Sequence, residues 1–181
     1  MIKKIKILIV TVFLTAFGGV TYASFTDGLN AAIEGDYKTA LKEWQSLADQ
    51  GNASAQYNLG LMYDNGRGVL KDYKQAVKWY QKAADQGYAG AQLNLGVRYA
   101  NGEGVLKDDK QAVKWYRKAA DQGHTSAQYN LGLMYAKGRG VLKDLSKAKY
   151  WIKKAYENPS ANSKTKNLAE ENLNELELWK Y

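Results

Sequence analysis

The chain has 181 residues, the size of one ordinary domain, with 45% apolar and 12% aromatic residues. This composition excludes an intrinsically disordered protein. The lack of cysteine excludes both a disulfide-stapled fold and a lipoprotein anchor, so the fold has to be held together by packing. The formal net charge of +8 is moderate and does not by itself establish an anionic partner.

Residues 1–23 have the three-part layout of a secretory signal peptide. A basic start with three lysines is followed by the apolar stretch 7–17, and Ala23 provides a small residue at the cleavage point. The apolar stretch is shorter than the about 20 residues of a membrane-spanning helix. An uncleaved anchor that extends to Ala23 is the competing interpretation. We predict cleavage near Ala23 and export to the periplasm or beyond.

Residues 24–51 are predicted to form a first helical hairpin. One helix runs from Phe25 to Gly35, and a short turn that contains Asp36 leads into a second helix that ends at Gly51. This hairpin has no long glycine loop, in contrast to the units that follow it. We interpret it as the N-terminal cap of a stacked array, because the ends of such arrays have to be closed.

The following residues repeat with a period of 36. The segment 51–63 recurs at 87–99 and 123–135, and the segment 76–87 recurs at 112–123 almost residue for residue. One hairpin cannot bury its own apolar stripe, so repeats of this kind indicate a solenoid in which neighbouring units cover one another. We place the repeat units at residues 52–87, 88–123 and 124–158.

Each repeat unit is predicted to contain two helices. In the first unit Ala55 and Leu59 are four residues apart and share one stripe of the first helix. Gly66 and Gly68 then interrupt the helix, since glycine accepts positive φ. Asp72 is placed to cap the second helix, with a glutamine three residues later as in a capping box.

Residues 159–181 are predicted to form a linker and a last helix. Pro159 and its polar neighbours break the repeat, and the helix follows from residue 164. Its apolar residues are expected to pack on the final repeat, and its outer face is acidic, as a terminal cap should be polar. The apolar residues are Leu168, Leu173, Leu176 and Trp179, and the acidic ones are Glu170, Glu171, Glu175 and Glu177.

The repeated pattern resembles the Sel1-like repeat, and the first hairpin resembles the related tetratricopeptide repeat. The resemblance implies an all-α fold, a right-handed α-solenoid of stacked helix hairpins, whose members mostly act as scaffolds and adaptors. Bacterial members are often exported and linked to envelope functions, signalling or host contact. The pattern is Ala55-x3-Leu59-Gly60-x2-Tyr63-x2-Gly66-x-Gly68-Val69-x2-Asp72-x3-Ala76-x2-Trp79-Tyr80-x2-Ala83-Ala84-x2-Gly87.

The sequence contains no arrangement of residues that is typical of catalysis. His124 is the single histidine and replaces Tyr88 and Asn52 of the other copies, which predicts a tolerant surface position without metal-ligand partners. Ser146 and Ser163 are each followed by a lysine at the Ser-x-x-Lys spacing of serine acylases, but no Lys-Thr-Gly motif accompanies them. We therefore predict no enzyme, no metal and no cofactor.

The family resemblance also raises an enzymatic alternative. Some exported, cysteine-rich relatives have been described as penicillin binders or β-lactamases, which implies a cell-wall-related hydrolase or penicillin-binding function. In that branch a disulfide ties each repeat, whereas this chain has no cysteine. The activity is therefore not transferred.

The first helix of each pair usually lines the concave side of a stacked-hairpin solenoid. An apolar row of Leu61, Val97 and Leu133 is expected to run along this groove, and such rows favour a protein or peptide partner. The alternative is that these residues pack between adjacent units. We expect a monomer without a nucleic-acid partner. The predicted groove residues are Ser54, Tyr57, Leu61, Asp64, Gly90, Leu93, Val97, Ala100, Ser126, Tyr129, Leu133 and Ala136.

Lysines at spacings of three or four form one stripe on each predicted second helix. The first interpretation is a solvated convex face that keeps the protein soluble. The second is weak contact with an anionic envelope surface, such as phospholipid or acidic polysaccharide. The basic face comprises Lys71, Lys74, Lys78, Lys82, Lys107, Lys110, Lys114 and Lys118, roughly continued by Lys143, Lys147 and Lys154.

Overall fold

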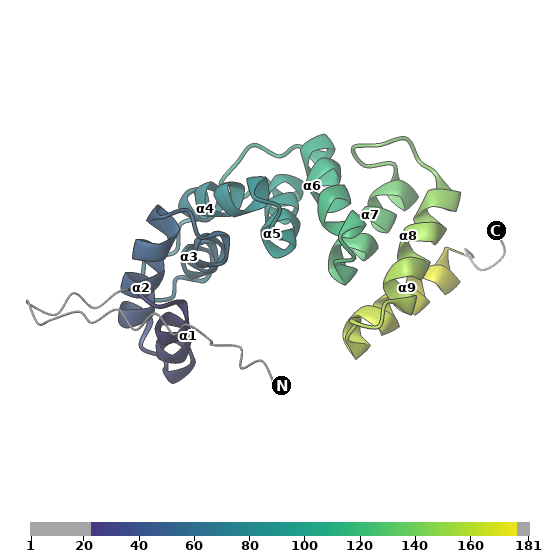
Figure 1. Cartoon of the computed structure of the whole chain (residues 1–181). Helices are drawn as coiled ribbons and strands as arrows, with labels where there is room; N and C mark the ends of the chain where they lie inside the picture. The colour runs from purple at the N-terminus through teal and green to yellow at the C-terminus, as the bar shows by residue number, and fades with distance from the viewer. Residues whose placement is uncertain (1–22, 177–181) are drawn as a thin grey trace, which may run out of the picture.

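The structure, a computed structural model, describes residues 23–176. Residues 1–22 of the predicted signal peptide lie outside the described residues, as do Glu177 and Trp179 of the predicted last helix. The described part consists of nine helices without a strand, and they form the arch seen in Figure 1. The predicted all-α solenoid is confirmed. Between residues 23 and 176 no helix has the length and hydrophobicity needed to cross a membrane.

Consecutive helices pair as hairpins, α1 with α2, α3 with α4, α5 with α6 and α7 with α8, and α9 packs on α8 and α7. The helices are α1 (Phe25–Glu34), α2 (Tyr37–Asp49), α3 (Ala53–Asn65), α4 (Tyr73–Asp85), α5 (Ala89–Asn101), α6 (Asp109–Asp121), α7 (Thr125–Lys137), α8 (Leu145–Glu157) and α9 (Ser163–Glu175).

The ends of the repeat helices follow the predicted capping signals with one difference. Asp72 caps α4 by accepting hydrogen bonds from the backbone N–H groups of Lys74 and Gln75. The reciprocal half of the capping box is not formed, because the Asp72 N–H donates to the Tyr63 carbonyl at 2.9 Å. This bond ties the start of α4 to the end of α3, and Asp108 and Asp144 repeat it in the next units.

A glycine in the first helix of each unit allows the two helices of the hairpin to pack closely. A Cβ added at Gly96 would lie 2.7 Å from the ring of Tyr116, and Gly132 faces Ile152 in the same way. The close approach at these glycines therefore lies within a hairpin. The joint between consecutive hairpins is built from other residues.

Buried amide side chains form that joint. Gln92 Nε2 donates to the carbonyl of Ala84 at 3.1 Å, and Gln92 Oε1 accepts from Gln122 Nε2 at 2.8 Å. The same two bonds occur at the equivalent positions of the other repeats. Gln56 donates to the Ala48 carbonyl and accepts from Gln86, and Gln128 donates to the Ala120 carbonyl and accepts from Asn158. The alanines around them pack helix against helix, and the amides satisfy buried polar groups that would otherwise be costly.

The long loops also connect neighbouring units. Gly104 has a φ of +75° and lies on the first turn of α4, in the preceding unit, where an added Cβ would overlap the carbonyl of Tyr73. Gly68 and Gly140 lie in the same way on α2 and α6. The second loop glycine is therefore required twice, for its backbone angle and for its lack of a side chain.

Within the described residues, packed helices cover both ends of the array. At the N-terminal end, Trp44 of α2 packs against Gly28 and Phe25 of α1. At the C-terminal end, Leu173 is fully buried and Leu168 and Leu176 are partly buried. Glu170, Glu171 and Glu175 remain exposed on the outer face of α9.

We expect Gly104→Ala to destabilise the protein more than Gly123→Ala. Gly123 has a φ of +85° with no atom within 4 Å of an added Cβ, so its alanine variant reports backbone strain alone. The Gly104 variant adds the overlap with Tyr73, which should cost roughly 1–3 kcal/mol more. Urea unfolding followed by circular dichroism measures both, and equal losses would contradict the proposed loop contact.

Candidate binding groove and basic face

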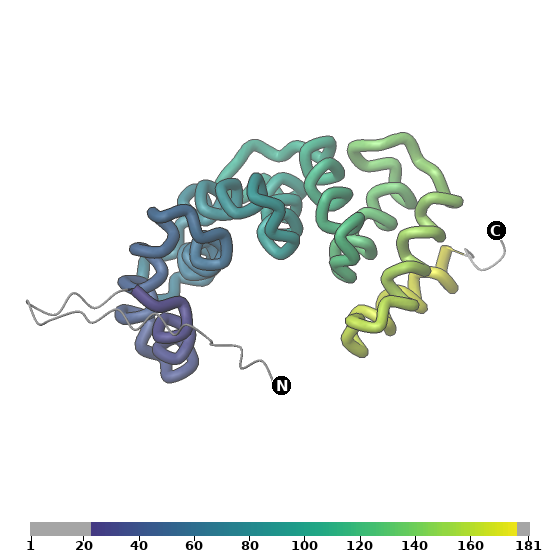
Figure 2. Tube along the Cα trace, in the orientation of Figure 1, coloured from purple at the N-terminus to yellow at the C-terminus, as the bar shows by residue number. Residues whose placement is uncertain are grey.

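The arch has an inner and an outer side. Figure 2 shows α3 and α5 nearer the inner side of the arch than α2 and α4. In the first two repeat units the first helix therefore lies towards the concave side. We call the apolar positions along this face, Leu29, Leu61, Val97 and Leu133, the inner row.

The inner row is neither fully exposed nor fully buried. Leu61, Val97 and Leu133 are partly buried, and each contacts the core with one flank. The two alternatives for these residues therefore both hold in part, since they pack on adjacent units and also present surface. Leu29 of α1 extends the row and is 43% exposed. The comparison of the repeat copies within the sequence did not identify Leu29, because the first hairpin has a shorter turn and does not follow the 36-residue period.

The three residues expected beside the row are held by neighbouring side chains. The ring of Tyr57 lies 4.8 Å from that of Tyr88, centroid to centroid, and burial raises its pKa. The hydroxyl of Tyr129 accepts a hydrogen bond from Asn172 Nδ2 of α9 at 2.9 Å. Leu93 packs against the core cluster formed by residues of α6, α7, α8 and α9. These three side chains therefore mainly contact other side chains of the protein and present little free surface.

Two of the predicted groove residues are corrected by the structure. Ala136 is only 5% exposed and belongs to the core, so its side chain does not face a partner. Asp64 lies 3.3 Å from Arg98 Nη1 and accepts a hydrogen bond from the Tyr80 hydroxyl, so it is part of a joint between units. Burial, and then the Asp64 carboxylate, raise the pKa of Tyr80 well above its usual range.

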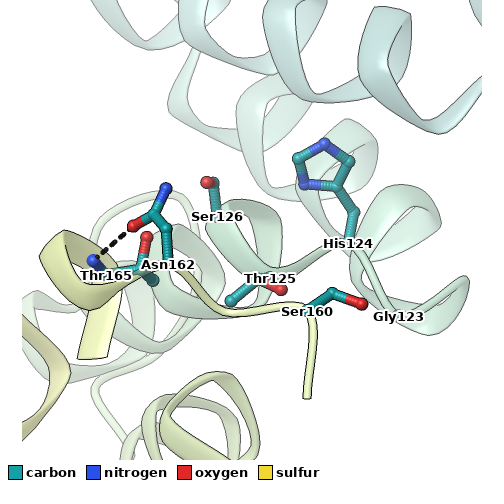
Figure 3. A pocket seen from close by; sticks show the side chains of 7 residues that line it. All are labelled: Gly123, His124, Thr125, Ser126, Ser160, Asn162 and Thr165. Carbon is teal, nitrogen blue, oxygen red and sulfur yellow. Dashed lines mark hydrogen bonds between the residues drawn. The ribbon is translucent and has the colours of Figure 1, made fainter. Parts of the chain in front are cut away.

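The small predicted groove residues are partly buried, and one of them lines a polar cavity. Ser54 and Gly90 lie in the first turns of α3 and α5, and Ala100 near the end of α5. Ser126 borders a cavity of about 300 Å³ between the start of α7 and the α8–α9 linker. Figure 3 shows this cavity, with Asn162 Oδ1 accepting from the backbone N–H of Thr165.

His124 stands at the edge of this cavity and differs from its predicted role. It is half-buried rather than on an open surface, its Nδ1 has no hydrogen-bond partner among the described residues, and burial lowers its pKa. In Figure 3 its ring points away from Asn162 and Thr165. No group of three metal-ligating side chains forms in residues 23–176. Ser146 and Ser163 are exposed in the first turns of α8 and α9.

Two further cavities lie where the concave face meets the long loops. The first, which we call the N-terminal pocket, measures about 250 Å³ and lies between α1, α2 and α3. The second measures about 150 Å³ and lies between α5, α6 and α7. Leu61 borders the first and Leu133 the second. Inner-row residues at equivalent repeat positions therefore line cavities at equivalent places in the fold.

Arginines beside these positions, which the sequence analysis did not single out, form the main ion pairs. Arg139 binds the carboxylate of Asp109 with two bonds, of 2.6 Å and 3.1 Å. This pairing lowers the pKa of Asp109. Arg98 lies 2.6 Å from Glu103 and also faces Asp64. Their signal in the sequence was the variation between copies at otherwise repeated positions.

The lysines of the basic face are all exposed, on α4, α6 and α8 and in the loops before these helices. Lys82 Nζ lies 4.0 Å from the ring centroid of Trp79, and Lys118 Nζ lies 4.3 Å from that of Trp115. Lys154 repeats the arrangement over Trp151. The last lysine of each stripe therefore covers a tryptophan. Among the earlier ones, Lys71, Lys114 and Lys147 also lie over aromatic rings.

Three leucines at equivalent loop positions are unusually exposed. Leu70, Leu106 and Leu142 are 91%, 92% and 90% exposed, and each precedes a basic-face lysine. Figure 1 shows the loops after α5 and α7 on the outer side of the arch. Single exposed leucines are ordinary on protein surfaces, but three at the same repeat position form a regular feature of the outer edge.

Sel1 repeats match the chain at residues 53–88, 89–124 and 125–160, which is more than half of its length. The protein belongs to the Sel1 repeat family. Sel1 repeat proteins generally act as protein-interaction scaffolds rather than enzymes. None of the curated proteins matches the chain.

Solved structures agree with the family. The chain is similar to a Sel1 repeat protein from Oxalobacter formigenes, at 38% identity and a TM-score of 0.72, over 76% of this chain and 56% of that one. It is also similar to c5321, a protective antigen of uropathogenic Escherichia coli strains with an SLR fold, at 35% identity and a TM-score of 0.70, over 84% of this chain and 36% of that one.

Helicobacter pylori cysteine-rich protein B shares the fold, at 23% identity and a TM-score of 0.56, over 72% of this chain and 96% of that one. At this identity the likeness concerns the fold alone. The chain spans 56% and 36% of the lengths of the two more similar proteins, so the functions of those whole proteins do not carry over directly.

We expect Asp109→Asn to destabilise the Sel1 repeat protein at neutral pH by roughly 0.2–1 kcal/mol, since the pair with Arg139 is partly exposed. The folded-state pKa of Asp109 is lowered, so its contribution is present above about pH 4 and is lost as the pH falls through the folded-state pKa. Urea unfolding at several pH values checks this.

Arg139→Gln is the matched control, because it keeps the carboxylate at the start of α6 while removing its partner. The same pH-dependent loss in both variants would assign the effect to the ion pair. A pH-dependent stability that survives Arg139→Gln would assign it to the interaction of Asp109 with the helix dipole.

Proposed function

We propose that this Sel1 repeat protein is exported and acts as a scaffold that binds a protein or peptide partner on the inner face of its arch. The signal-peptide layout of residues 1–23 supports export. The inner row carries the binding part of the proposal, because it presents apolar surface along a concave face that ends in cavities. Apolar anchors in preformed pockets are typical of partner recognition.

The N-terminal half of the concave face supports this function best. Leu29 is 43% exposed and Ile33, one helical turn further along α1, is 75% exposed. Both line the N-terminal pocket together with Leu61. Burial of large side chains in a partner interface is favourable at about 25 cal/mol for each Å² of apolar surface removed from water.

We expect Leu29→Asp/Ile33→Asp to abolish binding of a partner from a cell-envelope extract, because charges would replace the most exposed apolar side chains of the concave face. The fold should persist, since neither side chain is buried. Affinity capture with the wild-type protein and the variant, followed by mass spectrometry, measures the loss. Circular dichroism confirms that the variant is folded.

Lys78→Glu/Lys114→Glu is the control, because it also makes the net charge more negative, by a larger amount, at exposed positions of α4 and α6. A partner retained by wild type and by this control but lost by the concave variant would support the proposal. Equal retention by all three proteins would refute it. The N-terminus of the purified protein tests export, because cleavage after Ala23 leaves Ser24 as the first residue.

A second function, contact with an anionic envelope surface, is favoured by the outer edge of the loops. Leu70, Leu106 and Leu142 protrude separately, and each is next to a lysine. Separate protruding side chains do not form the contiguous patch that a protein partner covers, whereas each can enter a lipid interface on its own. Neighbouring lysines attract such a surface when it is anionic.

We expect the protein to sediment with phosphatidylglycerol vesicles more than with phosphatidylcholine vesicles, and the binding to weaken as salt is raised. Leu70→Ser/Leu106→Ser/Leu142→Ser should reduce the bound fraction without unfolding the protein, because these side chains contact solvent. Binding that is absent, or that neither salt nor this variant changes, would contradict surface contact through the loops.

A further inference from the structure

Equivalent positions in the repeats provide an internal comparison of three joints. One position is Met62, Arg98 and Met134 in the successive units, and another, in the long loop, is Arg67, Glu103 and Arg139. The third position, which starts the second helix of the preceding hairpin, is Tyr37, Tyr73 and Asp109. The backbone is the same at each joint, so the differences between joints come from these side chains.

The second and third joints satisfy their own charges. In the second, Arg98 lies against Glu103 at 2.6 Å and Asp64 at 3.3 Å and stacks over Tyr73. In the third, Arg139 makes two bonds with Asp109. Each arginine is thus neutralised by carboxylates of the protein itself.

The first joint has the arginine without the acid. Arg67 occupies the position of Arg139, but Tyr37 occupies that of Asp109, so the guanidinium stacks over a ring at 5.7 Å. No carboxylate within residues 23–176 pairs with Arg67, whose side chain remains exposed. Two-bond carboxylate binding at the equivalent Arg139 shows the geometry that this loop position supports.

Arg67 also lines the N-terminal pocket. The pocket measures about 250 Å³, several times the roughly 30 Å³ of a water molecule, so it has room for a large side chain. Leu29, Ile33, Leu61 and Met62 give it an apolar lining. An unpaired guanidinium therefore stands at the edge of an apolar cavity, and the two features favour a ligand that is apolar and acidic at neighbouring positions.

We propose that the N-terminal pocket binds a peptide segment of a protein partner by taking one large apolar side chain into the cavity and pairing a neighbouring Asp or Glu carboxylate with Arg67. This inference rests on the proposed scaffold function and names the partner's chemistry. The partner's carboxylate takes the place that Asp109 occupies beside Arg139. Recognition depends on the first joint, because the arginines of the other two joints are already paired.

A random peptide library displayed on phage provides the probe. We expect wild type to enrich peptides in which Leu, Ile, Phe or Trp lies next to or near Asp or Glu. Arg67→Glu should instead enrich Lys or Arg in place of the acid, because it inverts the charge at an exposed position. Arg139→Gln is the control and should select the same peptides as wild type.

A double-mutant cycle on one selected peptide measures the pairing itself. Replacement of its acidic residue by the amide should weaken binding to wild type about tenfold, as judged by fluorescence anisotropy. The same replacement should have little effect on Arg67→Gln. Higher salt should reduce the difference on wild type, because the pair is exposed to solvent.

The outcomes separate this inference from the proposed function. Peptides that require Ile33 but show no acidic preference, or no dependence on Arg67, would overturn the carboxylate pairing and leave a groove that binds apolar peptides. Failure of wild type to select any peptide would overturn both. A selection that follows the charge at position 67 supports both.

Discussion

The rest of the structure depends on the joint between consecutive hairpins. No hairpin can bury its own apolar stripe, so each must be covered by the next unit at a fixed position. Alanines make the close approach possible, and the amides of Gln56, Gln92 and Gln128 satisfy the helix-end carbonyls that the approach buries. Because an unpaired buried amide is costly, these bonds favour one register. The arch, its inner row and its outer loops all follow from that register.

Repetition gives each joint the same backbone, and the side chains then make the joints different. The second joint is closed by Arg98, whereas methionines stand at its counterparts, Met62 and Met134. Cavities lie at the first and third joints, beside Met62 and Met134. A scaffold built in this way can vary recognition from unit to unit without altering its fold, since the loop position of Arg67, Glu103 and Arg139 lies outside the buried core.

The inner and outer sides of the arch present different chemistry. The inner side offers apolar surface whose residues also pack on the core, so the proposed binding would use side chains that are already held in place. The outer side carries lysines, of which the last in each stripe covers a tryptophan. Part of the basic charge therefore contributes to packing as well as to a solvated surface.

The sequence by itself determined the helices, their hairpin pairing, the glycine loops and the family. The reason is that the same helix, cap and glycine signals recur every 36 residues. It also predicted that Leu61, Val97 and Leu133 form a row along the first helices of the repeats. It did not determine that Ala136 is buried, that Asp64 pairs with Arg98, or that Leu29 joins the row. Those facts depend on distances between units. Only the stacked tertiary structure decides which side chains at equivalent positions contact another side chain of the protein and which are exposed to solvent.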